Sequence, residues 1–220
     1  MKADGIEFDV HLSRDRVPVI IHDEELERTT NGKGLVRDYN LDQLKKLDAG
    51  SWFDSAYVKE KIPTLDEVFT HYQNSNLLFN IELKNSLTAN PGIEGIVINC
   101  IVKYSLEKRV IISSFNHDSL QICRQINSKI RTGLLYLEEV EEPWLYARKL
   151  DCYSVHPLFF YLQNPELLAG FEEHNIPLYP WTVNDPEQMK KLVNAGVEGI
   201  ITDYPQLLKK ILMEVIDENF

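Results

Sequence analysis

Two acidic residues, Glu7 and Asp9, lie two positions apart in the otherwise apolar stretch IEFDV near the start of the chain. Successive side chains of a β-strand point to opposite faces, so Ile6, Phe8 and Val10 share one face and the two acids share the other. An edge strand with one face in water explains this pattern. A pair of metal ligands explains it equally well, and the choice between the two depends on charged residues elsewhere in the chain.

The stretch NIELK repeats the pattern, with Glu82 and Lys84 on one face of a predicted strand. Two carboxylates about 5 Å apart repel each other by roughly 3 kcal/mol at an effective dielectric constant of 20, so they need a counter-ion. Lys84 could neutralise one of them. A hard divalent cation with oxygen ligands could bind Glu7, Asp9 and Glu82 together. A salt-bridged interior without a metal is the alternative that the spacing leaves open.

Two further residues are candidates for the same site. His22 ends the apolar stretch PVIIH and is followed by Asp23. A histidine beside an acid suits general acid/base catalysis near neutral pH, although a lone histidine at a strand end is more often structural. Trp181, at the end of the predicted strand IPLYPWTV, is either a core residue or a wall of the substrate pocket.

The elements that must position these residues follow a repeated pattern. Predicted strands begin at residues 77, 109, 131, 152, 176 and 198, with amphipathic segments of helix length between them. This spacing is typical of β-loop-α units with parallel strands. A doubly wound sheet usually carries an early glycine-rich phosphate loop, and none is present. With the opening strand included, the sequence predicts an α/β fold: a TIM (β/α)8-type barrel with seven of its eight strands present.

The predicted barrel is one domain. Residues 1–220 are expected to form a single, incomplete TIM-barrel domain, in which residues 11–61 are a small insertion after the first strand of this chain. The insertion contains His22, an Asn31-Gly32 turn and a short predicted helix. Insertions after barrel strands decorate the C-terminal face of the barrel, where active sites lie.

Composition excludes several classes of function. The chain is 44% apolar and 26% charged, and no apolar run approaches the ~18 residues of a membrane-spanning helix, so stable membrane insertion is not expected. A net charge of −11 argues against broad binding of nucleic acid or anionic membranes. Three widely spaced cysteines fit no disulfide framework and predict a reduced, cytoplasmic protein.

Several motifs together closely resemble those of bacterial glycerophosphodiester phosphodiesterases, namely DGIEFDVHL, VPVIIHDEELERTTNGKGLV, NIELK, WTVN and GVEGIITDYP. The resemblance covers nearly the whole chain, in order. It implies a TIM barrel and the hydrolysis of small-molecule glycerophosphodiesters to sn-glycerol 3-phosphate and an alcohol. The roles it implies are binding of Ca²⁺ or Mg²⁺ by Glu7, Asp9 and Glu82, phosphate contact by Lys84, acid/base catalysis by His22, and a wall of the glycerol pocket formed by Trp181.

The chain departs from the family pattern at its start. The family has a strand ending in His-Arg, which supplies a second catalytic histidine, before the equivalent of ADGIEFDV. That strand is absent here, so we expect low activity from this chain by itself. An inactive barrel kept for binding or assembly, and a phospholipase-type phosphodiesterase of the same fold, remain as alternatives. A homo-oligomer also remains open.

Overall fold

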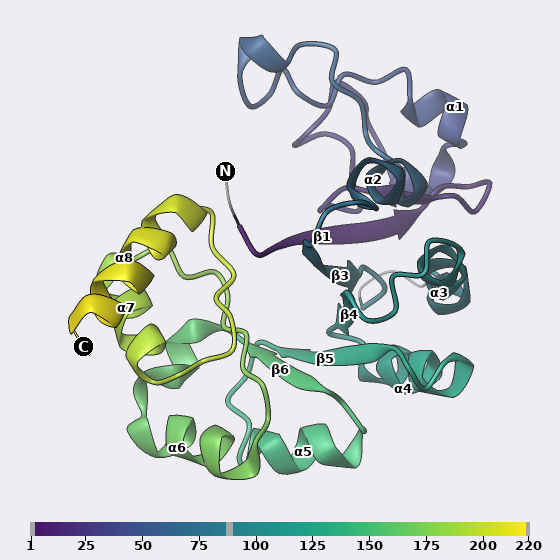
Figure 1. Cartoon of the computed structure of the whole chain (residues 1–220). Coiled ribbons are helices and arrows are strands. Elements are labelled where there is room, and N and C mark those ends of the chain that lie inside the picture. The colour runs from purple at the N-terminus through teal and green to yellow at the C-terminus, as the bar shows by residue number, and fades with distance from the viewer. Residues whose placement is uncertain (1–2, 87–89, 219–220) are drawn as a thin grey trace.

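The computed structural model describes residues 3–86 and 90–218 and consists of an open ring of strands with helices on its outside (Figure 1). Six strands form one sheet in the order β2-β1-β3-β4-β5-β6. Neighbouring strands from β1 to β6 run parallel, whereas β2 is antiparallel to β1. The strands are β1 (Gly5–Leu12), β2 (Pro18–Ile20), β3 (Leu78–Leu83), β4 (Val110–Ser114), β5 (Arg131–Tyr136) and β6 (Ser154–Pro157).

Two extended segments, residues 176–183 and 198–203, continue the ring beyond β6 with less regular pairing. Pro177 and Pro180 have no N–H group, so a continuous ladder cannot form. The segments are placed by main-chain hydrogen bonds, among them Tyr179 N to Val155 O at 2.9 Å and Ile201 N to Pro180 O at 3.0 Å. Together with β1 and β3 to β6 they give seven strand positions, which confirms the predicted TIM (β/α)8-type fold.

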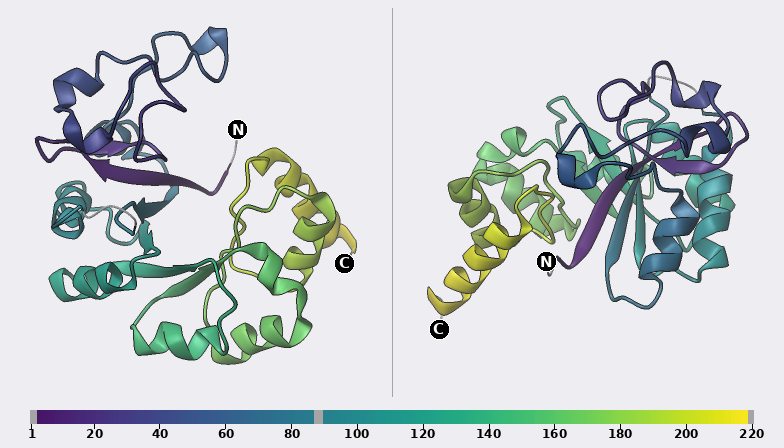
Figure 2. Two further views of the ribbon diagram at one scale, coloured as in Figure 1. Left: turned by 180° about the vertical axis from the view of Figure 1, so that it is seen from behind. Right: turned by 90° about the horizontal axis from the view of Figure 1, so that it is seen from above.

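Helices cover the outside of the ring, as the views in Figure 2 show. The first of them begins at a capping box, in which Thr64 Oγ1 accepts from Glu67 N and Glu67 Oε2 accepts from Thr64 N. Such a cap typically stabilises a helix by about 1 kcal/mol. No helix in the described part of the chain is long and apolar enough to span a bilayer. The α-helices of the ring are α2 (Leu65–Tyr72), α3 (Ile93–Lys103), α4 (His117–Ile126), α5 (Pro143–Lys149), α6 (Pro165–His174), α7 (Pro186–Asn194) and α8 (Pro205–Glu218).

The segment between β1 and α2 has a small hydrophobic core of its own, which includes Val19, Leu26 and Leu44. β1 continues to Leu12, so the strand overlaps the first residues of the insertion predicted at 11–61. The extent of the insertion stays a prediction. The short elements of this segment are β2, η1 (Val36–Asp38), α1 (Leu41–Leu44) and η2 (Ser55–Tyr57); a further 3-10 helix, η3 (Phe159–Gln163), follows β6.

One row of residues crosses five strands in register and shares one face of the sheet. The row consists of Asp9, Glu82, Ser113, Gly133 and Ser154. Gly133 is needed there for packing, because a Cβ at this position would lie 2.5 Å from Nε2 of the buried His156. The charged part of the row therefore lies on β1 and β3, and small residues occupy β4 to β6.

His156 is fully buried, with its Nε2 2.8 Å from Ser154 Oγ, and burial lowers its pKa to about 3. In the unfolded chain the pKa of this histidine is near 6.5. Between pH values of about 3 and 6.5 the unfolded chain therefore binds up to one more proton than the native protein, and the free energy of unfolding should fall as the pH drops. We expect His156→Asn to flatten this fall by about 1.4 kcal/mol per pH unit between pH 5.5 and 4. Urea unfolding at several pH values measures the slope. The exposed His71 supplies the control His71→Asn, and an unchanged slope in His156→Asn would contradict the prediction.

Candidate active site

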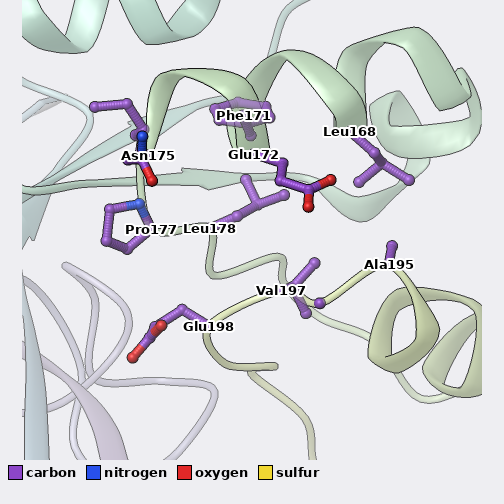
Figure 3. Close-up of a pocket in the computed structure, with 11 residues that line it drawn as sticks. Leu168, Phe171, Glu172, Asn175, Pro177, Leu178, Ala195, Val197 and Glu198 are labelled. Carbon is purple, nitrogen blue, oxygen red and sulfur yellow. The ribbon is translucent and has the colours of Figure 1, made fainter.

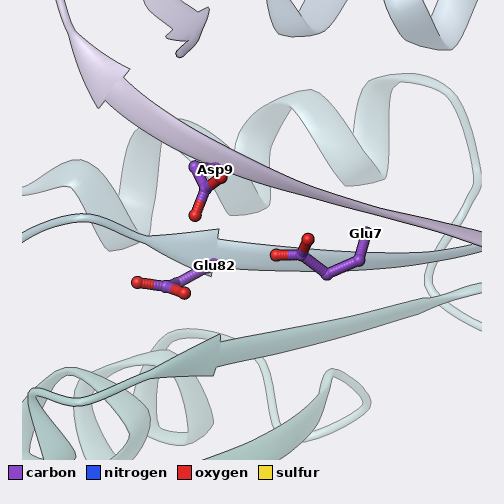
Figure 4. A group of neighbouring side chains, drawn as sticks. All are labelled: Glu7, Asp9 and Glu82. Carbon is purple, nitrogen blue, oxygen red and sulfur yellow. The ribbon is translucent and has the colours of Figure 1, made fainter. Parts of the chain in front are cut away.

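Three carboxylates from β1 and β3 converge on the same side of the sheet (Figure 4). Asp9 lies opposite Glu82 in the register of β1 and β3, and Glu7 lies two residues before Asp9 in β1. One carboxylate oxygen from each residue lies within 4.8 Å of the others. Desolvation and the negative charges of Asp9 and Glu82 raise the pKa of Glu7 to about 8, although Glu7 itself is an exposed residue. Desolvation likewise raises the pKa of Glu82.

Lys84 provides the counter-charge. Its Nζ lies 2.7 Å from Glu82 Oε1 and 3.0 Å from Asp9 Oδ1, and only 17% of the side chain is exposed. Desolvation opposes the charged form of Lys84, but the two carboxylates outweigh it and raise the pKa. Lys84 N also donates to Val10 O at 3.1 Å, which fixes the main chain that carries the ammonium against β1.

His22 reaches this cluster from the segment that follows β2. Its Nε2 lies 3.5 Å from Lys84 Nζ, and its Nδ1 lies 2.6 Å from Asp23 Oδ1. Because an ammonium can only donate, we assign the tautomer with the proton on Nδ1, donated to Asp23. Asp23 in turn accepts from Arg28 at 2.8 Å, and hydrogen bonds from Arg28 and His22 lower the pKa of Asp23. A carboxylate supported by an arginine therefore orients the imidazole and leaves its Nε2 facing the cluster.

Trp181 lies at the end of segment 176–183, further around the ring. Its Nε1 donates to His156 O at 2.8 Å, and its ring meets Phe115 edge-on at 5.8 Å. Phe115 follows β4 directly, so both rings lie at the carboxyl ends of strands. These side-chain contacts of Trp181 are with His156 and Phe115, and its main chain is bonded to Pro157 and Phe159.

The donor set fits a hard divalent cation. One oxygen from each of three carboxylates lies within 4.8 Å of the other two, close enough for all three to bind one ion. The mutual repulsion of the carboxylates favours a bound positive charge. Glu7, Asp9 and Glu82 could each contribute one oxygen to such an ion.

Comparison with known proteins decides which family this arrangement represents. Residues 1–207 match the glycerophosphoryl diester phosphodiesterase family. The chain belongs to this family. It is 47% identical over 206 residues to a glycerophosphodiester phosphodiesterase of Caldanaerobacter subterraneus subsp. tengcongensis, with 94% of this chain and 84% of the relative covered. It is 35% identical to a glycerophosphodiester phosphodiesterase of Bacillus subtilis, with 96% of this chain and 77% of the relative covered.

A solved structure agrees with this membership of the glycerophosphoryl diester phosphodiesterase family. The fold matches an Oleispira antarctica phosphodiesterase in complex with the product sn-glycerol-3-phosphate, at a TM-score of 0.81 and 31% identity. The match covers 95% of this chain and 85% of that one. The chain is therefore an enzyme of this phosphodiesterase family.

The structure brings together most of the candidate site residues that were singled out from the sequence. The connected set is Glu7, Asp9, His22, Glu82 and Lys84. Trp181 lies outside this set. Two residues near the site were not singled out from the sequence: Arg28 lies in an irregular loop without periodicity, and Phe115 carries no signal beyond its place as the last residue of the predicted strand RVIISSF.

A cavity of about 310 Å³ lies elsewhere, between α6 and residues 195–198 (Figure 3). Ile176 and Leu178, at the start of segment 176–183, line it, so it opens near the amino-terminal end of that segment. None of the candidate site residues is among its lining residues. The chemistry of this phosphodiesterase family is therefore expected at the carboxylate cluster and not in this cavity.

Proposed function

We propose that the protein hydrolyses glycerophosphodiesters to sn-glycerol 3-phosphate and a free alcohol in a reaction that depends on a divalent cation. The observation that carries the proposal is the contact between Lys84, two of the three clustered carboxylates and His22. The Oleispira antarctica phosphodiesterase with bound sn-glycerol-3-phosphate supports a small-molecule substrate of this class. In net terms a water oxygen forms a new P–O bond, the P–O bond to the alcohol breaks, and the alcohol leaves with one of the protons of the water.

In this proposal the side chains have separate roles. Glu7, Asp9 and Glu82 bind Ca²⁺ or Mg²⁺, both of which prefer oxygen ligands, and the ion offsets negative charge on the phosphate. Lys84 adds a positive charge beside the same phosphate. His22 moves a proton at the reacting oxygen through Nε2, since its Nδ1 is held by Asp23.

Trp181 is proposed to form a wall of the pocket on the glycerol side. Its support is its position at the carboxyl end of a strand, with its indole N–H already bonded to His156 O. That bond leaves the ring face for apolar contact with substrate carbon atoms.

We also propose that this chain, by itself, turns over more slowly than its relatives. Among the histidines that the structure describes, the ring of His22 is the one with a hydrogen-bond contact to Lys84 of the cluster. Proton transfer at both the attacking and the leaving oxygen is commonly shared between two groups, and losing one such group typically costs 10²- to 10⁴-fold in rate.

The test is release of sn-glycerol 3-phosphate from glycerophosphoethanolamine, with the 47% identical Caldanaerobacter enzyme as the reference. We expect turnover with Ca²⁺ or Mg²⁺, loss of that turnover with a chelator, and recovery when the metal is restored. The rate should lie at least 100-fold below that of the reference. Turnover that resists chelation would overturn the metal role, and a rate equal to the reference would overturn the proposal of slow turnover.

A reducing compartment such as the cytoplasm is proposed for the protein. Cys100, Cys123 and Cys152 are all free thiols, and Cys123 and Cys152 are buried. Burial raises the pKa of all three, which keeps them protonated and weakly reactive. Free thiols of this kind are typical of proteins that are kept reduced.

A further inference from the structure

A second cluster of polar side chains lies next to the turn that follows Lys84, and the proposed reaction does not use it. Its members come from the segment just after β3, the last residue of β4 and the first turns of α3 and α4. They are Asn85, Ser114, Glu94 and Ser119, each less than a tenth exposed. We call these four residues the turn network.

Hydrogen bonds link all members of the turn network. Asn85 Nδ2 donates to Ser119 Oγ at 2.6 Å and to Glu94 Oε1 at 3.3 Å. Ser119 Oγ donates to the same Glu94 oxygen at 2.6 Å. On the other side, Ser114 Oγ lies 3.1 Å from both Asn85 Oδ1 and Leu83 O. The side chain of Asn85 is therefore held at both its oxygen and its nitrogen.

The main chain around the turn is held as well. Asn90 Nδ2 donates to Lys84 O at 2.8 Å, and Asn116 Nδ2 donates to Asn85 O at 3.4 Å. Lys84 N donates to Val10 O at 3.1 Å. The N–H and C=O groups of Lys84 are thus both bonded, which restricts rotation and translation of this residue.

The composition of the turn network favours a positioning role over simple packing. A buried polar group stabilises the fold only when it is paired, and an apolar residue of similar size usually packs at lower cost. A fully bonded polar network instead specifies one geometry, because each partner restricts the next. Turns after strands are ordinarily exposed and mobile, whereas Asn85 is buried and bonded to two helices and a strand.

We infer that the turn network of Asn85, Glu94, Ser114 and Ser119 consists of positioning residues that hold Lys84 in place to bind the substrate phosphate. This inference rests on the proposed role of Lys84 in the reaction. Within the described residues, the hydrogen bonds of the network given above go to none of Glu7, Asp9 and His22; they hold Asn85 and Leu83 O, the neighbours of Lys84 in the chain.

The test exchanges donor and acceptor within the network. Asn85→Asp removes the amide donor and places a carboxylate against Glu94, so the network should break. Glu94→Gln in the same chain restores a donor–acceptor pair with the two roles reversed. Ser119→Ala removes a single hydroxyl and gives a milder version of the test. The control is Ser75→Ala, which removes a hydroxyl that binds Arg109 and Tyr72 O at the opposite ends of β3 and β4.

Two measurements are made on every variant. Steady-state hydrolysis of glycerophosphoethanolamine with Ca²⁺ gives kcat and KM, and amide hydrogen exchange at Lys84 reports local opening of the turn. For Asn85→Asp we expect kcat/KM to fall at least tenfold, mainly through KM, and exchange to become at least tenfold faster. Ser119→Ala should change both by about threefold. The double variant should return both to within threefold of the parent, and Ser75→Ala should leave both unchanged.

Two results would overturn the inference. One is an Asn85→Asp variant that differs from the parent no more than Ser75→Ala does. The other is a double variant that recovers slow exchange and thermal stability without recovering kcat/KM, which would mean a merely structural role. If the parent chain shows no turnover, the proposed function fails instead, and the exchange data alone then decide whether the network holds Lys84.

Discussion

Glu82→Gln is expected to lower turnover by about 100- to 1000-fold and to weaken Ca²⁺ binding at least tenfold. The substitution keeps the shape of the side chain but removes one of three carboxylate groups whose oxygens lie within 4.8 Å of one another. A bound metal typically contributes several kcal/mol to the stabilisation of charge in the transition state, and the loss of a ligand forfeits much of that contribution. Steady-state hydrolysis and calorimetric titration with Ca²⁺ measure the two effects.

Thermal unfolding of this variant should separate catalysis from folding. Glu82 is buried and contacts Lys84 at 2.7 Å, so a modest change in the melting temperature is expected. Glu172→Gln makes the same chemical change at an exposed position on α6 and serves as the control. Hydrolysis by Glu82→Gln at the parental rate would rule out Glu82 as a metal ligand.

The second large effect is expected from His22 and the residue that orients it. His22→Gln should reduce kcat by 10²- to 10⁴-fold, because it removes the group proposed to move the proton. Asp23→Asn should reduce kcat about tenfold, since Asp23 accepts from Nδ1 and thereby fixes the direction of Nε2. Ca²⁺ binding should change less than twofold in both variants, because neither residue belongs to the carboxylate cluster.

His71→Gln is the matched control for this pair, since His71 is exposed on α2. His22 itself has 61% of its side chain exposed, so its replacement is not expected to unfold the protein. A loss of metal binding that parallels the loss of kcat would show that His22 acts through the metal site, and the proton-transfer role would then be wrong.

Alternation within short strands made much of this site predictable. Glu7 and Asp9 share a face because they are two residues apart in β1, and Lys84, directly after the end of β3, contacts Glu82, two residues before it. The strand spacing that predicted a barrel also predicted that these ends would meet. The pairing of Asp9 with Glu82 could not be read from the sequence, since register depends on how two distant segments pack.

Other features had no local signal at all. Arg28 supports Asp23 from an irregular loop in which no period indicates a face. Glu94 and Ser119 lie on different helices, and only the folded barrel brings them to Asn85. Gly133 looks like an ordinary small residue in a strand, yet the imidazole of His156 occupies the space that its side chain would need. Such contacts depend on how distant segments pack together, and the residue pattern within a single segment does not predict them.

The ammonium of Lys84 between Asp9 and Glu82 is also expected to affect folding. Because this positive charge belongs to the chain itself, it offsets charge repulsion in the cluster throughout folding, whatever the supply of ions during synthesis. We therefore expect the chelated protein to stay folded, in contrast to small domains whose folding depends on their metal. If the proposed ion binds here, its loading would be a separate, reversible step after folding, and activity would follow the concentration of free divalent cation at a constant amount of protein.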